Sequence, residues 1–347
     1  MQFIDLKSRH QLIKDQIDAR VQTVMEHGQF ILGPEVRELE EKLSHYIGVK
    51  HCISVSSGTD SLLIALMALG VGVGDEVITV PYTWISSAEV IALLGAIPVF
   101  VDIRSDTWNM NEQLLESVIT EKTKAIMPVS IYGQTSDMDA INEIAGKYNI
   151  PVIEDAAQSF GATYKGKKSC NLSTIGSTSF FPSKPLGCYG DGGALFTNED
   201  ELAEKFRWIR VHGQERKHHH PILGVNGRMD TLQAAILLAI FEVFPEEVIR
   251  RQEIGNLYTS SLSKTSGIRT PSIAEGNTSV YAQYTILSDK RETIQETLKL
   301  QGIPSVSYYT VPLHLQPVFA SLGHKKGDFP VSEDVADRCL SLPMSPY

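Results

Sequence analysis

Lys184 lies in a turn whose composition suits a reactive amine. Residues 179–187 read SFFPSKPLG, and a glycine-rich segment follows at 190–193. Burial in such apolar, stiff surroundings disfavours the ammonium, lowers the pKa of the lysine and leaves a nucleophilic amine. Such an amine can form a Schiff base with a carbonyl compound. The segment is equally typical of an ordinary turn lysine before a strand, so other residues must decide between the two interpretations.

Asp155 stands just past a predicted buried strand at residues 151–154. A carboxylate in this place needs a partner, because an unpaired buried charge is costly. The ring nitrogen of pyridoxal phosphate fits this role, since the protonated ring is an electron sink for carbanion chemistry. A helix N-cap or a structural ion pair is the alternative.

Two further segments could complete a cofactor site. Residues 56–61 precede a predicted helix, where free N–H groups and the helix dipole favour an anion, and Gly58 permits close approach. Plain N-capping is the alternative there. Trp84 follows another predicted strand and could stack on a planar ring or fill the core. Each signal is weak alone, but together with Asp155 and Lys184 they predict one site for a phosphorylated planar cofactor.

Such a site needs a fold that brings strand ends together. Strands are predicted at 51–56, 76–80, 97–102, 125–130 and 151–154, and helices between them at 60–68, 87–94, 111–119 and 138–148. This alternation predicts an α/β fold with βαβ crossovers and a mostly parallel sheet flanked by helices. Ligands of such sheets bind beyond the carboxyl ends of the strands, where Trp84 and Asp155 stand.

The pattern changes after about residue 250. A long apolar helix at 232–243 leads out of the sheet region, and a strand at 282–287 and a helix at 293–301 follow. We therefore expect a large α/β domain at residues 1–245, including an N-terminal helix. A smaller C-terminal α+β domain is expected at 246–347.

The composition argues against several classes of protein. The 347 residues are 42% apolar and 21% charged, which is typical of a globular protein large enough for two domains. A net charge of −10 without a long basic run argues against nucleic acid as a partner. Apolar runs stay below the roughly 20 residues of a membrane span, and we expect no signal peptide. Four widely spaced cysteines without a CxxC pair indicate reduced thiols, so we expect a cytoplasmic enzyme without a metal.

Several motifs occur in an order that matches one known family. They are FILGPEV at 30–36, SGTD at 57–60, GDEVI at 74–78, PVFVD at 98–102, EDAAQ at 154–158, the lysine turn, NGRMD at 226–230 and PLH at 312–314. Nearly end to end, the chain resembles the DegT/DnrJ/StrS family of pyridoxal-phosphate sugar-nucleotide aminotransferases. The resemblance implies the fold-type I architecture of these enzymes.

The same resemblance implies roles for individual residues. Lys184 would be the Schiff-base lysine and Asp155 the partner of the ring nitrogen. Trp84 would stack on the ring, and Gln158 would lie near the ring hydroxyl. Family relatives that dehydrate their substrate carry histidine at the lysine position, so Lys184 favours transamination.

The implied phosphate site draws on two subunits. Gly58, Thr59 and Ser179 would hold the phosphate, together with Asn226 from the other subunit. This implies a homodimer with shared active sites. Candidate contacts for the sugar nucleotide or the amino donor are Arg228, Tyr309 and His314.

Within this family, the chain resembles one subgroup most at residues 171–173, 179–193 and 280–284. Its members aminate UDP-2-acetamido-2-deoxy-3-oxo-D-glucuronate at C3 for O-antigen and other surface polysaccharides. L-glutamate is their amino donor, and 2-oxoglutarate leaves. This chain departs from the subgroup at Tyr308-Tyr309, where His-Tyr is expected, so the substrate pocket is expected to differ. It also stops before the closing helix that the resemblance leads us to expect.

Three alternatives stay open at this point. The first is a sister aminotransferase acting on a 3-keto or 4-keto dTDP-hexose. The second is a non-catalytic regulatory protein with the cofactor fold, against which Lys184 and Asp155 argue. The third is a metal site at residues 218–220 with His212. Three adjacent histidines on a regular element cannot all face one ion, which favours a loop near the substrate.

Overall fold

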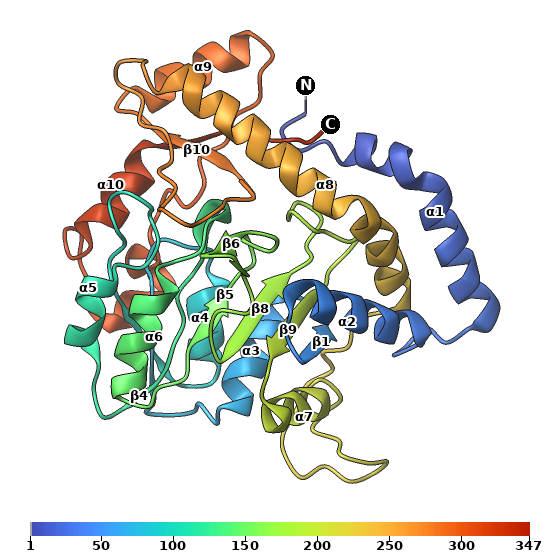
Figure 1. The fold of residues 1–347 in the computed structure, drawn as a ribbon. Helices are drawn as coiled ribbons and strands as arrows, with labels where there is room; N and C mark the ends of the chain where they lie inside the picture. The colour runs from blue at the N-terminus through green and yellow to red at the C-terminus, as the bar shows by residue number, and fades with distance from the viewer. Residues whose placement is uncertain (1) are drawn as a thin grey trace.

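A mostly parallel β-sheet forms the centre of the protein, whose computed structural model describes residues 2–347 (Figure 1). One part has the order β3-β2-β4 and the other β5-β8-β9-β1. Bridges between Ile126 and Val152 and between Val129 and Asp155 join the two parts. The strands are β1 (His51–Val55), β2 (Glu76–Thr79), β3 (Ile97–Phe100), β4 (Thr123–Ile126), β5 (Ile153–Asp155), β8 (Ile175–Ser179) and β9 (Gly193–Thr197).

The predicted parallel pairing is confirmed, with one strand that departs from it. Strand β2 runs parallel to β3 and β4, and β5 runs parallel to β8. Strand β9, by contrast, is antiparallel to both β8 and β1. No strand is predicted at β8, because its sequence IGSTS lacks the β-branched alternation typical of a strand. Strands β8 and β9 flank the lysine turn, so the missed part of the sheet is the part that positions Lys184.

Helices surround the sheet (Figure 1). They are α1 (Leu6–His27), α2 (Pro34–Ile47), α3 (Gly58–Ala68), α4 (Ser86–Leu93), α5 (Glu112–Leu115), α6 (Met138–Lys147), α7 (Asp200–Ile209) and α8 (Thr231–Leu262). Helix α1 packs on α8 rather than on the sheet itself. Alternate residues of β9 face opposite sides of the sheet: Phe196 packs in a core with α2 and α8, and Leu195 in a core with α3 and α7. The helix predicted at 111–119 is shorter, because α5 passes into a 3₁₀ turn at Glu116–Val118.

The C-terminal part has its own small core. It contains β10 (Tyr284–Leu287), α9 (Arg291–Leu300), α10 (Pro330–Arg338) and β11 (Cys339–Leu342), and β10 pairs antiparallel with β11. Tyr284, Ile286, Leu340 and Leu342 pack against the end of α8 in this core. Leu287, Val335, Ala336 and Cys339 belong instead to the core around β2 and β4. The division into domains at 245/246 stays a proposal, and it falls inside α8 beside Pro245.

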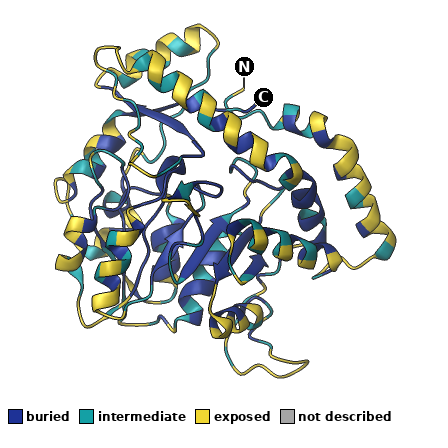
Figure 2. Ribbon diagram, in the orientation of Figure 1, coloured by how far each residue is buried: buried dark blue, intermediate teal, exposed yellow. Residues whose placement is uncertain are grey.

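The buried residues concentrate in the sheet, and the outer faces of α1 and α8 are largely exposed (Figure 2). Short strands β6 (Thr163–Tyr164) and β7 (Lys167–Lys168) form a separate hairpin. Within residues 2–347, no helix combines the length and the apolar character that a bilayer crossing requires.

Candidate active site

A cavity of about 580 Å³ lies between the strand ends of the large sheet and the C-terminal part of the chain. Eight of the eleven residues singled out from the sequence line it: Gly58, Thr59, Trp84, Asp155, Gln158, Ser179, Lys184 and Tyr309. Asn226 and Arg228 line another cavity, and His314 is buried against Phe329. The order of motifs along the chain therefore corresponds to one place in the fold.

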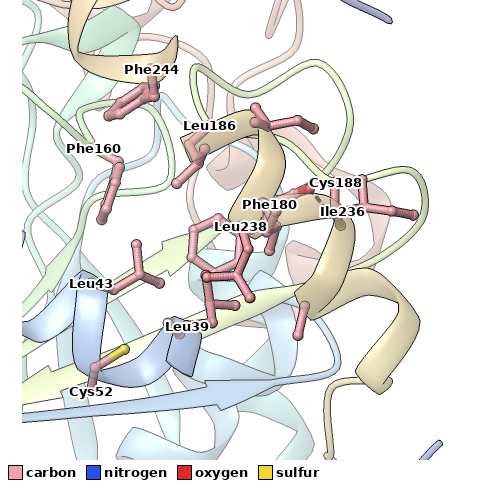
Figure 3. Packing of buried hydrophobic residues seen from close by; sticks show 14 of the residues in the cluster. Leu39, Leu43, Cys52, Phe160, Phe180, Leu186, Cys188, Ile236, Leu238 and Phe244 are labelled. Carbon is pink, nitrogen blue, oxygen red and sulfur yellow. Dashed lines mark hydrogen bonds between the residues drawn. The ribbon is translucent and has the colours of Figure 1, made fainter. Parts of the chain in front are cut away.

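The lysine turn is held by its apolar neighbours. Phe180 and Leu186, which precede and follow Lys184 along the chain, are fully buried. They lie in the core between the sheet and α8 (Figure 3). The Phe180 N–H donates to the carbonyl of Gly192 at 2.7 Å, and the Lys184 N–H donates to the carbonyl of Phe181 at 2.8 Å. The lysine side chain is thus presented from a fixed backbone into the cavity.

Enclosure by protein lowers the pKa of Lys184 through desolvation of its amine, although the nearby Asp155 carboxylate acts in the opposite direction. Lys184 is partly exposed because it faces the cavity, so its amine is desolvated and also reachable. Of the two interpretations of the turn, the geometry supports the reactive amine.

Asp155 ends β5 and is buried at the cavity floor. Its carboxylate accepts hydrogen bonds from the Ser87 hydroxyl at 2.9 Å and from the Ala157 N–H at 3.2 Å. Burial raises the pKa of Asp155, while these hydrogen bonds and Lys184 oppose the increase. Among the described residues no cation lies within salt-bridge distance of it, so the structural ion pair is not formed. The carboxylate is available for a cationic group of a ligand.

The start of α3 combines an N-cap with an open anion site. The hydroxyl of Ser57 caps the helix by accepting from the Asp60 N–H at 3.0 Å. The backbone of Gly58 lies so close to Ser179 that a Cβ would stand 2.5 Å from the Ser179 Cβ, which explains the glycine. The Thr59 hydroxyl bonds that of Ser86 at 2.8 Å. Backbone N–H groups at a helix start and two hydroxyls together suit a phosphate.

Trp84 does not fill the core. Its side chain is 61% exposed and lines the cavity, in the loop between β2 and α4. A large exposed aromatic face at a cavity is suited to stacking on a planar ligand.

A directed chain of hydrogen bonds ends at Tyr309. The Tyr132 N–H donates to Gln158 Oε1 at 2.9 Å, which leaves Gln158 Nε2 to donate to the Tyr309 hydroxyl oxygen at 2.9 Å. Because that oxygen accepts, the O–H of Tyr309 remains free to donate. Burial raises the pKa of Tyr309 well above its usual value, so the proton is retained.

Asn226 and Arg228 line a neighbouring cavity of about 380 Å³. Asp191, in the glycine-rich segment after the lysine turn, lines both cavities, so the two adjoin. The Nε of Arg228 is buried without a hydrogen-bond partner among the described residues. A cation with unused donor capacity therefore stands beside the main cavity, outside its lining.

His314 does not reach either cavity. Its ring is 1% exposed, bonds Glu333 through Nε2 at 3.0 Å, and packs on Phe329. The expected contact with a substrate therefore has no geometric support, because neighbouring side chains enclose the imidazole.

Several lining residues were not found from the sequence. Ser87, the partner of Asp155, stood at the predicted start of a helix, and that position was its only signal. Tyr308, at the position where the chain departs from the subgroup, also lines the cavity. Gln283 and Ser307 come from the C-terminal part and are brought to the cavity by tertiary packing alone. No local pattern could have indicated them.

The arrangement fits pyridoxal phosphate. It offers a desolvated lysine amine, a buried carboxylate without a cationic partner, an exposed aromatic face and an N–H and hydroxyl site for a phosphate. These four features come from four separate segments of the chain. Each corresponds to one chemical group of that cofactor.

Comparisons with known proteins agree with this geometry. The model of the DegT/DnrJ/EryC1/StrS aminotransferase family matches residues 11–347. Over 347 residues the chain is 58% identical to the UDP-2-acetamido-2-deoxy-3-oxo-D-glucuronate aminotransferase of Pseudomonas aeruginosa, covering 100% of this chain and 96% of that protein. It is 48% identical over 345 residues to the pleiotropic regulatory protein of Geobacillus stearothermophilus, a match that covers 99% of this chain and 93% of that protein. The fold is also similar to the crystal structure of ntda from Bacillus subtilis with bound cofactor PMP, with a TM-score of 0.90 and 31% sequence identity. That match covers 96% of this chain and 78% of the ntda chain.

Proposed function

The chain belongs to the DegT/DnrJ/EryC1/StrS aminotransferase family, and from this premise we propose its substrates. It is a pyridoxal-phosphate-dependent aminotransferase of nucleotide sugars. We propose that it moves the amino group of L-glutamate to C3 of UDP-2-acetamido-2-deoxy-3-oxo-D-glucuronate. The product would serve O-antigen or another surface polysaccharide. The observation that carries the catalytic assignment is the meeting of Lys184 and Asp155 in one cavity.

Bound pyridoxal phosphate supplies the electron sink that stabilises negative charge on the reacting carbon. Asp155 would hold its ring nitrogen in the protonated form, and Trp84 and Gln158 would position the ring. Gly58, Thr59 and Ser179 would hold its phosphate.

Lys184 acts as the proton carrier of the reaction. Desolvation lowers the pKa of its amine and so favours the neutral form that can take the proton from the α-carbon of glutamate. In the second half of the reaction Nζ delivers a proton to C3 of the sugar. The hydrogen-bonded backbone of the turn holds the lysine in one place, so that its Nζ faces the cavity where the substrates would bind.

We propose a homodimer in which each subunit completes the other's site. Lys184 is the one cation among the described residues of the cavity lining, whereas the proposed substrates carry carboxylates and a diphosphate. Asn226 and Arg228 lie in the adjoining cavity, next to the exposed Ile31. If a second copy docks at this face, its Asn226 amide and Arg228 guanidinium would reach the carboxylates and the diphosphate of substrates bound in the first copy.

Subunit mixing tests the shared site. We expect the Lys184→Ala and Asn226→Ala variants each to be inactive or nearly so, and a mixture of them to recover activity. In an equal mixture, about half of the dimers contain one copy of each variant. If Asn226 acts across the interface, each mixed dimer has one intact site, so about a quarter of all sites in the mixture are active. If Asn226 serves its own subunit, no intact site forms and the mixture stays inactive. A Lys184→Ala variant mixed with itself is the control.

A panel of keto sugars tests the substrate. The keto uronate is generated in situ and compared with 3-keto and 4-keto dTDP-hexoses, with L-glutamate as donor and mass detection of the amino sugar. We expect the uronate to give the highest kcat/KM, by at least about tenfold. A dTDP-hexose that equals or exceeds it would replace the proposed substrate.

A regulatory role is the second candidate, suggested by the name of the 48% identical relative. The desolvated Lys184 beside Asp155 favours catalysis. Adding L-glutamate to the cofactor-loaded protein should change its visible spectrum within seconds. An unchanged spectrum would favour regulation. We also propose a cytoplasmic location, supported by four cysteines that are all free thiols.

A further inference from the structure

The two hydroxyls proposed to hold the cofactor phosphate differ in how their hydrogens are used. The Ser179 Oγ accepts from the Phe181 N–H at 3.2 Å, and among residues 2–347 its own hydrogen has no acceptor. The Thr59 Oγ1 lies 2.8 Å from the Ser86 Oγ, and one hydrogen bond joins these two oxygens. Ser179 is therefore ready to donate to a phosphate, whereas the hydrogen of Thr59 depends on how Ser86 is bonded.

Glu89 fixes the direction of the hydrogen bond between Thr59 and Ser86. The Ser86 hydroxyl donates to Glu89 Oε1 at 3.1 Å, because a carboxylate can only accept. A hydroxyl has a single hydrogen, so the Ser86 oxygen must accept from Thr59. The hydrogens of both hydroxyls are thereby directed toward Glu89. Thr59 and Ser86 line the cavity, and Glu89 lies outside its lining.

The bond between Ser86 and Glu89 is not a cap of α4. The N-cap residue of α4 is Ile85, which forms no side-chain cap, and the Glu89 N–H donates to the Ile85 carbonyl at 2.9 Å. The helix dipole favours an acid in this first turn. Among residues 2–347, however, no cationic side chain lies within salt-bridge distance of the Glu89 carboxylate. Its negative charge is therefore unfavourable to a second anion bound nearby.

We propose that Glu89 weakens the phosphate site through Ser86 and so limits how tightly the cofactor is held. Thr59 can donate to a phosphate only if Ser86 turns its hydrogen from Glu89 to Thr59, which breaks a charge-assisted hydrogen bond. If Ser86 does not turn, Thr59 contributes no hydrogen to the phosphate. Both outcomes lower the affinity. Glu89 is thus a positioning residue, and this inference rests on the proposed function, which has Thr59 and Ser179 hold the phosphate.

The effect matters most when the cofactor carries the amino group. In that amine form the cofactor has no carbonyl that could form a Schiff base with Lys184, so non-covalent contacts alone hold it. The phosphate site then contributes a large share of the binding. A site weakened by Glu89 lets the amine form leave and be replaced between the two half-reactions.

Pyridoxamine phosphate and pyridoxamine test the inference, because the two compounds differ only in the phosphate. Their Kd values for the cofactor-free full chain are measured by equilibrium dialysis. In Glu89→Gln the amide can donate to Ser86, which directs the hydrogens of Ser86 and Thr59 toward the phosphate. We expect the Kd of this variant for pyridoxamine phosphate to fall roughly 3- to 20-fold. Its Kd for pyridoxamine should change by less than about twofold.

Glu201→Gln is the matched control for the change of charge. Glu201 also stands in the first turn of a helix, α7, and lies outside the cavity lining, so both Kd values should equal those of the wild type.

Ser86→Ala is a second variant, which leaves the charge of Glu89 in place. It frees the hydrogen of Thr59, so we expect pyridoxamine phosphate to bind roughly threefold more tightly or better. Adding Thr59→Val to Ser86→Ala should abolish this gain, because no hydroxyl is left to donate. Thr59→Val should therefore cost more affinity in the Ser86→Ala background than in the wild type.

Unchanged or weaker binding of pyridoxamine phosphate in Glu89→Gln or in Ser86→Ala would overturn the inference. An equal gain for pyridoxamine would overturn it too, since Glu89 would then act on the ring. Ser179→Ala distinguishes failure of the proposed phosphate site. If this variant binds pyridoxamine phosphate as tightly as the wild type, the proposed site and the inference are both wrong. If it binds more weakly while Glu89→Gln shows no gain, only the inference is wrong.

Discussion

The two walls of the cavity differ in how completely their polar groups are paired. On the large-domain wall, Asp155 has two donors, and the lysine turn is fixed by backbone hydrogen bonds and core packing. On the C-terminal wall, Gln283 has an unpaired oxygen and Tyr309 has an O–H free to donate. The groups that the large-domain wall offers to a ligand are held in place by the protein, whereas polar groups of the C-terminal wall have hydrogen-bonding capacity that the protein leaves unused.

This difference corresponds to what each wall would bind. A cofactor that stays in place is best served by groups that are already oriented, since preorganised groups need no rearrangement during the reaction. A substrate that enters and leaves is selected by polar groups that only it can pair. The hydrogen bond from Gln158 to Tyr309 is a direct link between the walls, and substitutions on each side can test the division.

Lys184→Ala should have the largest effect. We expect turnover to fall at least about 10³-fold, because the proton carrier is removed. The visible absorbance of the lysine–cofactor linkage should disappear. Lys168→Ala is a matched control: burial lowers the pKa of Lys168 as well, but it packs on Tyr46 outside the cavity. If Lys184→Ala retains both turnover and absorbance, Lys184 neither binds the cofactor nor carries the proton, and the large-domain wall is not the catalytic one.

Asp155→Asn should have the next largest effect. The amide has the same shape but cannot keep a ring nitrogen protonated, so we expect a loss of about 10²- to 10³-fold in kcat. Cofactor content should fall far less, since the phosphate site and Trp84 are untouched. Content is measured after alkaline release and turnover by 2-oxoglutarate formation. Loss of the cofactor in proportion to activity would mean that Asp155 only anchors the ring.

The two walls also differ in how well the sequence predicted them. Lys184, Asp155 and Gly58 sit at strand ends and helix starts, and local residue patterns are enough to indicate such places. Ser307 and Gln283 reach the cavity only because the C-terminal part packs across the strand ends. That depends on contacts between residues more than a hundred positions apart, which a single sequence does not reveal. The burial of His314 is a similar case, since its motif is visible in the sequence and its enclosure by Phe329 and Glu333 is not.

Tyr309→Phe tests the link between the walls. The variant leaves Gln158 Nε2 without its acceptor and removes the free O–H. We expect losses of about tenfold in both half-reactions, because Gln158 would position the cofactor used by both. Rapid mixing with L-glutamate and then with the keto sugar measures them separately. A loss in the sugar half-reaction alone would place Tyr309 wholly on the substrate side and sharpen the contrast between the walls.

Ser87→Ala should have the smallest effect, and its direction follows from electrostatics. The Ser87 hydroxyl donates to Asp155 and thereby lowers the pKa of that carboxyl, against the increase that burial causes. Without it the pKa of Asp155 rises further, so protonation begins at higher pH and the acid limb of the kcat profile moves upward. At neutral pH we expect a loss of about threefold. Ser87→Thr keeps a hydroxyl and should restore the wild-type profile. If the acid limb does not move in Ser87→Ala, the bound cofactor alone keeps Asp155 ionised. The hydrogen bond from Ser87 would then contribute little to the large-domain wall, although its geometry is good.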